Sequence, residues 1–165
     1  MSQPIILNLK TVLQMLPTRT PESHKGSYGK VLAVCGSSPY RGAAVLSVMG
    51  ALRTGAGLVT LAAPECVVAA AAARVPEAIF LPDAAQERIL EEVSRSEVCL
   101  LGCGLSADAD TAQLAKKALD ASMGVGVFDA GALCSLADDI SDITAFAQSQ
   151  PLIVTPHAGE MARLC

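Results

Sequence analysis

Short aliphatic runs alternate with stretches rich in Ala and Leu along most of this chain. The runs predict six strands, at 30–35, 57–62, 78–81, 98–101, 125–128 and 152–154. The stretches between them predict helices at 42–54, 65–73, 84–94 and 108–121, and a shorter helix inside 132–148. Because the predicted strands are continuously apolar, both faces of their sheet should be buried. The regular alternation of strand and helix therefore predicts right-handed crossovers and an α/β fold, with one mainly parallel sheet between two layers of helices.

The two ends of the chain depart from this alternation. Residues 7–16 predict an N-terminal helix with a turn-rich connection at 17–23, so we assign residues 1–20 to an N-terminal helix and connection. At the other end, a helix predicted at 160–165 has about one and a half turns and no capping signal. Since no linker or internal repeat interrupts the chain, we interpret residues 1–165 as a single domain that is incomplete at its C-terminal side.

The composition agrees with an aliphatic core and excludes several classes of protein. The 165 residues are 52% hydrophobic, 3% aromatic and 17% charged, a balance that excludes intrinsic disorder. A net charge of -4 without any Lys/Arg cluster argues against a nucleic-acid partner. No apolar run reaches the ~18 residues of a membrane span, and no signal peptide is recognisable, which predicts a cytoplasmic protein without a membrane partner. The six cysteines lack CxxC or Cys/His spacing, so we expect reduced, mostly buried thiols and no metal site.

Candidate ligand contacts are sought at the carboxyl ends of the strands, where open α/β sheets bind their ligands. The first predicted strand leads into a small-residue loop with Gly36, Ser37 and Gly42 that opens a helix, where backbone N–H groups could hold a polar or anionic ligand. This loop is neither a Walker loop nor GxGxxG, and turn formation explains it equally well. The fourth strand leads into Gly102 and Gly104, which permit positive φ and close approach of a ligand, although a plain tight turn explains them nearly as well.

Two polar residues follow the last two predicted strands. Asp129 comes directly after the fifth strand, where it either faces a ligand or a metal-bound phosphate, or caps the next helix. His157 lies in the loop after the sixth strand, and we favour a binding role for it over a capping role. His24 precedes the first strand on the opposite side of the sheet, which favours a structural role. Gly55 and Gly57 are interpreted as a helix end packed close to the sheet.

Seven short motifs follow one another in the order found in NAD(P)H-hydrate dehydratases. They are His24-Lys25-Gly26, Gly36-Ser37, Gly42-Ala43-Ala44, the run ALRTGAGLV at 51–59, Gly102-Cys103-Gly104-Leu105, Asp129-Ala130-Gly131-Ala132-Leu133 and Thr155-Pro156-His157-Ala158-Gly159-Glu160-Met161. From Pro21 onward the chain resembles the ADP- or ATP-dependent dehydratase domain of that family, a branch of the ribokinase-like superfamily.

This resemblance implies a three-layer ribokinase-like fold and the repair of hydrated nicotinamide cofactors. The substrates would be NADHX or NADPHX, with ADP or ATP as co-substrate and Mg2+ as its companion, and the protein would be a homo-oligomer such as a homotetramer. By position, the residues that would bind substrate are Ala43, Gly104, Asp129 and His157, and the supporting loop residues are Gly36, Ser37, Gly42 and Gly102. The implied chemistry is phosphorylation of the hydrate hydroxyl, after which the ring nitrogen expels phosphate.

The chain departs from the family pattern in two motifs and in length. Cys103 and Ser106 stand in a motif that usually reads Gly-Pro-Gly-Leu-Gly, and Gly131 replaces the second acid of Asp-Ala-Asp-Ala-Leu. The family domain continues for about a hundred residues, with a Gly-Thr-Gly-Asp helix start that supplies an anion hole and the catalytic aspartate. We therefore expect the catalytic aspartate beyond Cys165 and no dehydratase activity from these 165 residues alone. The alternatives are a ribokinase-like small-molecule kinase and a non-catalytic fragment or binding module.

Overall fold

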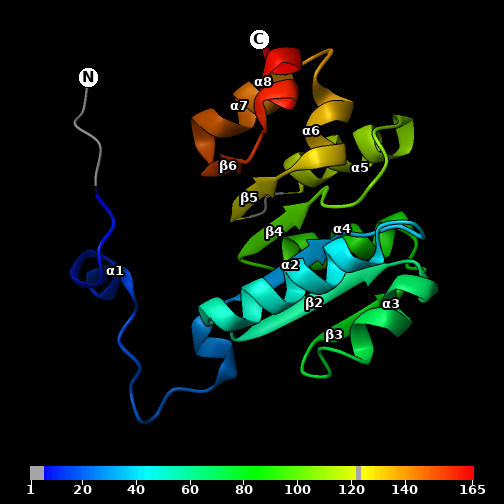
Figure 1. Cartoon of the computed structure of the whole chain (residues 1–165). Coiled ribbons are helices and arrows are strands. Elements are labelled where there is room, and N and C mark those ends of the chain that lie inside the picture. The colour runs from blue at the N-terminus through cyan, green and yellow to red at the C-terminus, as the bar shows by residue number, and fades with distance from the viewer. Residues whose placement is uncertain (1–5, 122–123) are drawn as a thin grey trace.

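The strands form one parallel sheet. In the computed structural model, which describes residues 6–121 and 124–165, the sheet has six strands in the order β3-β2-β1-β4-β5-β6 (Figure 1). The strands are β1 Lys30–Val34, β2 Leu58–Ala63, β3 Ile79–Pro82, β4 Val98–Leu101, β5 Val125–Phe128 and β6 Leu152–Val154. Every neighbouring pair is parallel. The predicted sheet is confirmed, with strand ends shifted by at most one residue.

Helices connect the strands and cover both faces of the sheet (Figure 1). They are α1 Leu9–Met15, α2 Arg41–Thr54, α3 Glu65–Ala72, α4 Gln86–Ser94, α5 Ala109–Asp120, α6 Ala130–Leu136, α7 Ser141–Ser149 and α8 Ala158–Leu164, with a short 3-10 helix η1 at Lys25–Tyr28. The single helix predicted inside 132–148 is wrong, because Ala137 to Ile140 separate two helices there. The 3-10 helix was not predicted.

Local sequence sets where the longer helices begin and end. The side chain of Asp108 accepts a hydrogen bond from the Thr111 backbone N–H at 2.9 Å, which starts α5. Gly55 ends α2 in the left-handed region at φ 108°, as a C-terminal glycine does, which confirms the helix end predicted there. None of the described helices is long and apolar enough to cross a membrane.

Two apolar layers, one on each face of the sheet, form the core. On one face, Val48 of α2 and Val67 of α3 pack with Leu61 of β2. On the other face, Leu133 of α6 packs in one cluster with Phe128 of β5, and all five side chains are fully buried. Complete burial of one such Leu or Phe stabilises the fold by about 1.5–3 kcal/mol. The core is therefore mainly aliphatic, as the composition predicts, with Phe128 and Phe146 as buried aromatic residues on one face.

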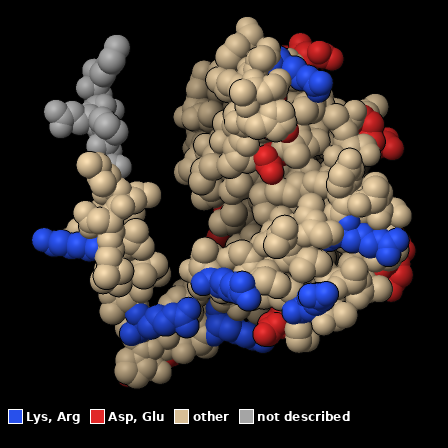
Figure 2. All heavy atoms as spheres, in the orientation of Figure 1, with Lys and Arg blue, Asp and Glu red and all other residues tan. Residues whose placement is uncertain are grey.

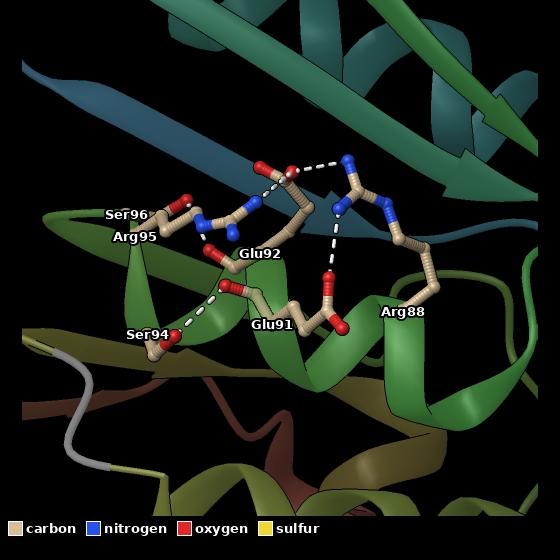
Figure 3. Close-up of polar contacts among 6 residues, drawn as sticks. All are labelled: Arg88, Glu91, Glu92, Ser94, Arg95 and Ser96. Atoms are coloured by element: carbon tan, nitrogen blue, oxygen red, sulfur yellow. Dashed lines mark hydrogen bonds and ion pairs between the residues drawn. The ribbon is translucent and has the colours of Figure 1, made fainter.

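The outer surface of α4 carries charges that pair along the helix (Figure 3). The Arg88 guanidinium donates to the carboxylates of Glu91 and Glu92, each at 2.8 Å. Arg88 is 45% exposed, so solvent screens these pairs and they add little stability. Their position leaves the opposite side of α4, with Val93, to pack against the sheet.

The strand order places a crevice beside β1. The chain moves from β1 outward through β2 to β3 and then returns to β4 on the other side of β1. The loops after β1 and β4 therefore leave in opposite directions, which is where sheets of this kind bind ligands. α1 lies apart from the sheet and none of its residues is buried (Figure 1).

Candidate functional site

The four strand ends selected from the sequence lie in one row along the carboxyl edge. The Gly36 N–H after β1 donates to the carbonyl of Cys103 after β4 at 2.7 Å. The Asp129 N–H after β5 donates to the Leu101 carbonyl at 3.1 Å, and the Thr155 N–H after β6 donates to the Phe128 carbonyl at 3.2 Å. The structure therefore brings the predicted loops together at this edge.

The loop after β1 presents unsatisfied polar groups at the start of α2. Within the part of the chain that the structure describes, the Ser37 Oγ is the one buried side-chain polar atom without a hydrogen-bond partner. Tyr40, at the N-cap of the 14-residue α2, makes no side-chain cap bond. A Cβ added at Gly42 would meet none of the described atoms within 4 Å. A helix start without a side-chain cap, the positive end of the helix dipole and a buried hydroxyl without a partner among the described residues together suit an anionic or polar ligand.

The loop after β4 packs directly on the first turn of α2. Gly102 and Gly104 have φ of 120° and 76°, which L side chains rarely adopt. A Cβ on Gly104 would lie 2.8 Å from the Cβ of Ala43 and 3.0 Å from that of Tyr40. Two of the predicted substrate contacts, Ala43 and Gly104, are therefore adjacent, and the close packing requires glycine.

Asp129 stands at the N-cap of α6 but does not cap it. Among the described atoms its side chain accepts no N–H of that helix, whereas its Oδ2 lies 3.3 Å from the thiol of Cys103, which donates to it. Of the two roles predicted for Asp129, the structure therefore does not show the capping role. The carboxylate is half-buried at the ligand edge, beside the loop that carries Gly104.

His157 is the N-cap of α8. Its Nδ1 accepts hydrogen bonds from the N–H groups of Gly159 at 3.0 Å and Glu160 at 3.3 Å, and the Glu160 carboxylate accepts from the His157 N–H at 2.9 Å. The prediction that this helix lacks a capping signal is wrong, because a capping box begins it two residues earlier than expected. The His157 side chain is 73% exposed, so a binding role for it stays a prediction.

Cys35 and Cys103 form a thiol pair in the wall of this edge. The hydrogen bond that Cys103 receives from the Cys35 thiol lowers the pKa of Cys103, and a bond from Ser47 lowers it further. The same bond, together with burial, raises the pKa of Cys35 well above its ordinary value.

All six cysteines are free thiols; Cys35 and Cys99 are buried, three are partly exposed and Cys165 is exposed. The prediction of mostly buried thiols therefore holds fully for two of the six.

Cavities lie at both edges of the sheet. One of about 310 Å³ at the carboxyl edge is lined by residues that include Gly36, Pro64 and Leu105. Another of about 610 Å³ lies at the amino edge and is lined in part by His24 and Gly55. The His24 Nδ1 accepts from the Gly26 N–H at 3.1 Å and caps η1, so its predicted structural role is confirmed. We place the candidate site at the carboxyl edge, since the unpaired Ser37 hydroxyl and the uncapped start of α2 lie there.

The described residues do not form a metal site. Within 6–121 and 124–165, no group of three or more His, Cys, Asp or Glu side chains could hold a metal ion.

Comparison with known proteins identifies the relatives of this chain. The sequence profile of the NAD(P)H-hydrate dehydratase family matches residues 31–165. A bifunctional NAD(P)H-hydrate repair enzyme from Moorella thermoacetica is 41% identical over 159 residues, which cover 90% of this chain and 30% of the relative.

Solved structures with the same fold include two bacterial proteins. A ribokinase-like superfamily protein from Enterococcus faecalis superposes with a TM-score of 0.81 at 25% identity, over 99% of this chain and 59% of that protein. The ADP/ATP-dependent NAD(P)H-hydrate dehydratase from Bacillus subtilis, co-crystallised with ATP and Mg2+, gives a TM-score of 0.72 at 28% identity, over 94% of this chain and 53% of that protein.

These matches confirm the predicted family and the ribokinase-like fold, and they favour the dehydratase prediction over a small-molecule kinase. The chain spans about half the length of several curated relatives, and 30% of the bifunctional one.

Proposed function

Because the chain belongs to the NAD(P)H-hydrate dehydratase family, we propose that its carboxyl-edge site binds (S)-NAD(P)H hydrate for conversion to NADH or NADPH, with ADP or ATP as co-substrate. The observation that carries this proposal is the arrangement around α2. A long helix without a side-chain cap follows a loop whose Ser37 hydroxyl is buried and has no partner among the described residues, and the loops after β4, β5 and β6 lie along the same edge. Such an edge suits a dinucleotide, which has anionic phosphates at its centre and flat rings at its ends.

Each predicted residue receives a role from its position. The first turn of α2, with Gly42 and Ala43, would hold the phosphates of the hydrated cofactor, with the Ser37 hydroxyl donating to one of their oxygens. Gly104 has no side chain and would let the ligand approach the main chain. The Asp129 carboxylate would accept a hydrogen bond from the hydroxyl of the hydrated ring, and the exposed imidazole of His157 would contact the ligand from the last loop.

The reaction removes one ring hydroxyl and one ring proton. Hydroxide is a poor leaving group, and transfer of a phosphoryl group from the nucleotide to the hydroxyl oxygen converts it into phosphate, which the ring nitrogen can expel. We propose that the described residues orient the ring and its hydroxyl for this transfer. Magnesium would accompany the nucleotide phosphates, which together with one or two carboxylates are its usual ligands in proteins.

We propose that these 165 residues bind the substrate but do not dehydrate it. The proposal rests on the resemblance, in which a Gly-Thr-Gly-Asp helix start supplies the catalytic aspartate, a segment that does not occur in the sequence. A spectrophotometric assay at the absorbance of NADH, with hydrate, Mg2+ and either ATP or ADP, should give no regeneration by the purified chain. Robust nucleotide-dependent regeneration would contradict this division of roles.

Two further proposals concern the oligomeric state and the cellular location of the protein. We propose a homo-oligomer, because α1 exposes Leu9, Leu13 and Met15 to solvent and an isolated helix of this length is unstable in water. A homotetramer in particular is what the family resemblance implies. Sedimentation should give a mass above that of one chain, and a monomer at every concentration would contradict it. We also propose a cytoplasmic location, since six free thiols suit a reducing compartment.

The binding proposal is tested by removing the unpaired hydroxyl. Ser37→Ala should weaken binding of hydrated NADPH about tenfold in isothermal titration calorimetry, because one hydrogen bond to an anion is lost. The same change should leave the unfolding midpoint unchanged or slightly raised, since it removes a buried polar atom without a partner. Ser135→Ala is the matched control, because the Ser135 hydroxyl donates to the Ala132 carbonyl at 3.0 Å within its own helix. Equal affinity for both variants would contradict the proposal.

A further inference from the structure

Two cysteines that are far apart in the sequence meet at the carboxyl edge. Cys35 directly follows β1 and is fully buried, whereas Cys103 lies in the loop after β4 and is partly exposed. Both side chains pack in the apolar layer under α2 and α3. They lie close enough there for each thiol to shift the pKa of the other. The Cys35 thiol also points toward the Leu100 carbonyl on β4, at 3.9 Å.

The backbone holds the two cysteines in place for a covalent bond. β1 and β4 are parallel neighbours, with Val34 paired to Leu101, and the Gly36 N–H donates to the Cys103 carbonyl at 2.7 Å. Neighbouring strands lie about 4.7–4.9 Å apart, and a disulfide joins residues whose Cα atoms are about 4.4–6.8 Å apart. Continuing this register sets Cys35 opposite Gly102, so Cys35 and Cys103 are diagonal neighbours, and a disulfide between them needs only a small movement of the loop after β4.

The surroundings of the two sulfurs differ in a way that separates their chemical roles. The neighbouring Cys35 thiol and Ser47 lower the pKa of Cys103 and favour its thiolate, while burial and the nearby Asp129 oppose this effect. The neighbouring Cys103 and burial raise the pKa of Cys35 well above its ordinary value, so Cys35, which is shielded from solvent, remains a thiol. The thiolate is the form of cysteine that attacks an oxidant.

We infer that Cys103 and Cys35 are an oxidisable pair in the wall of the ligand site, with Cys103 as the attacking thiol, Cys35 as the resolving thiol and a peroxide as the oxidant. The Cys103 thiolate attacks one oxygen of hydrogen peroxide and the O–O bond breaks, which gives a sulfenic acid and hydroxide. The Cys35 sulfur then attacks the Cys103 sulfur, the S–O bond breaks, and water leaves with the thiol proton. The two thiols lose two electrons in total, and the peroxide gains them.

Oxidation would change the edge at which the proposed ligand binds. The Cys103 thiol would no longer donate to Asp129, a contact of 3.3 Å, and the loop that carries Gly104 would be tied to the end of β1. This consequence for ligand binding rests on the proposed function. Formation of the disulfide does not, because it depends only on the two sulfurs and their surroundings.

The other cysteines provide internal controls. Cys99 lies in the apolar layer on the opposite face of the sheet, and burial raises its pKa to about 12. Cys66 and Cys134 are partly exposed like Cys103. An oxidant that reacted according to exposure alone would therefore modify Cys66, Cys103 and Cys134 at similar rates.

The test is peroxide oxidation of the reduced 165-residue chain, followed by alkylation under denaturing conditions and mass spectrometry. The alkylated cysteines should fall from six to four, and the tryptic peptides 31–41 and 96–116 should become linked, with fragmentation placing the bond at Cys103. Dimedone, which traps sulfenic acids, should label Cys103 at least about tenfold faster than Cys66 or Cys134, because the lowered pKa of Cys103 increases the fraction present as the reactive thiolate.

Variants separate the two steps. Cys103→Ser should abolish the linked peptide, whereas Cys35→Ala should stop the reaction at the dimedone-reactive sulfenic acid, and Cys66→Ala should change neither product. If Cys35→Ala does not fold, the linked peptide and the labelling rates of the unmodified chain still decide the question. Linkage through any other cysteine, or equal labelling of Cys66 and Cys103, would overturn the inference.

Discussion

Substitution of Gly102 by Ala should damage the carboxyl edge more than its small size suggests. Gly102 has φ of 120°, and a Cβ built on it would lie 1.9 Å from the Asp129 carbonyl oxygen and 2.8 Å from the Cβ of Ala132. The first contact is with backbone, so it cannot be relieved by rotation of a side chain. The loop after β4 and the start of α6 must therefore move apart.

The magnitude follows from two terms. Holding an L residue in this region of φ costs about 1–3 kcal/mol, and forcing an extra methyl group into closely packed surroundings costs about 1–3 kcal/mol more. We expect Gly102→Ala to lower the free energy of unfolding by about 4 kcal/mol, which in a chain of this size lowers the unfolding midpoint by about 8–16 °C.

Gly50→Ala is the matched control in this assay. Gly50 lies inside α2, where an added Cβ would meet none of the described atoms within 4 Å. Because Ala favours helix over Gly, this variant should be more stable by about 0.8–1 kcal/mol. Urea unfolding followed by circular dichroism measures both values. A Gly102→Ala chain within about 1 kcal/mol of the unmodified protein, or equal losses for the two variants, would refute the reasoning.

Three further predictions concern stability. Burial raises the pKa of Cys99 to about 12 from a model-peptide value of 9.0, so the folded chain retains this proton when the unfolded chain has lost it. The stability that this thiol contributes is fully present below pH 9 and falls by about 1.4 kcal/mol per pH unit between pH 9 and 12. Cys99→Val should remove this part of the pH dependence of the free energy of unfolding, measured by urea titration. The same pH dependence in the variant and the unmodified chain would contradict the prediction. Asp108→Ala should cost about 1 kcal/mol by thermal unfolding, because α5 loses its cap, whereas no loss would mean that solvent replaces the cap. Arg88→Met should cost less than about 1 kcal/mol, and the difference should vanish in 1 M salt; a loss that persists in salt would indicate packing rather than charge.

The sheet could be predicted closely because burial on both faces marks each strand with a continuous apolar run. Where an element depended on local hydrogen bonds, the prediction was poorer. The start of α8 was missed because His157 supplies the cap in place of the more usual Ser, Thr or Asp, although Glu160 three residues later carries the second half of the signal. Within 132–148, no break in the apolar pattern marks where α6 ends and α7 begins.

The candidate site was partly predictable for a topological reason. The carboxyl ends of parallel strands share one edge, so the sequence alone could select the loops with Gly36, Gly104, Asp129 and His157. It could not show which loops are neighbours, because that depends on the strand order. The contact between Cys35 and Cys103 follows from the pairing of β1 with β4, and the missing cap bond of Asp129 follows from its side-chain geometry.

Hydrogen–deuterium exchange with hydrated NADPH tests the central claim most directly, because it locates the ligand without requiring turnover. Addition of the ligand should slow exchange in the loops after β1, β4, β5 and β6, at residues 36–43, 102–106, 129–132 and 155–157. Protection confined to the amino-edge cavity lined in part by His24 and Gly55, or no protection at saturating ligand, would contradict a carboxyl-edge site for the hydrated cofactor.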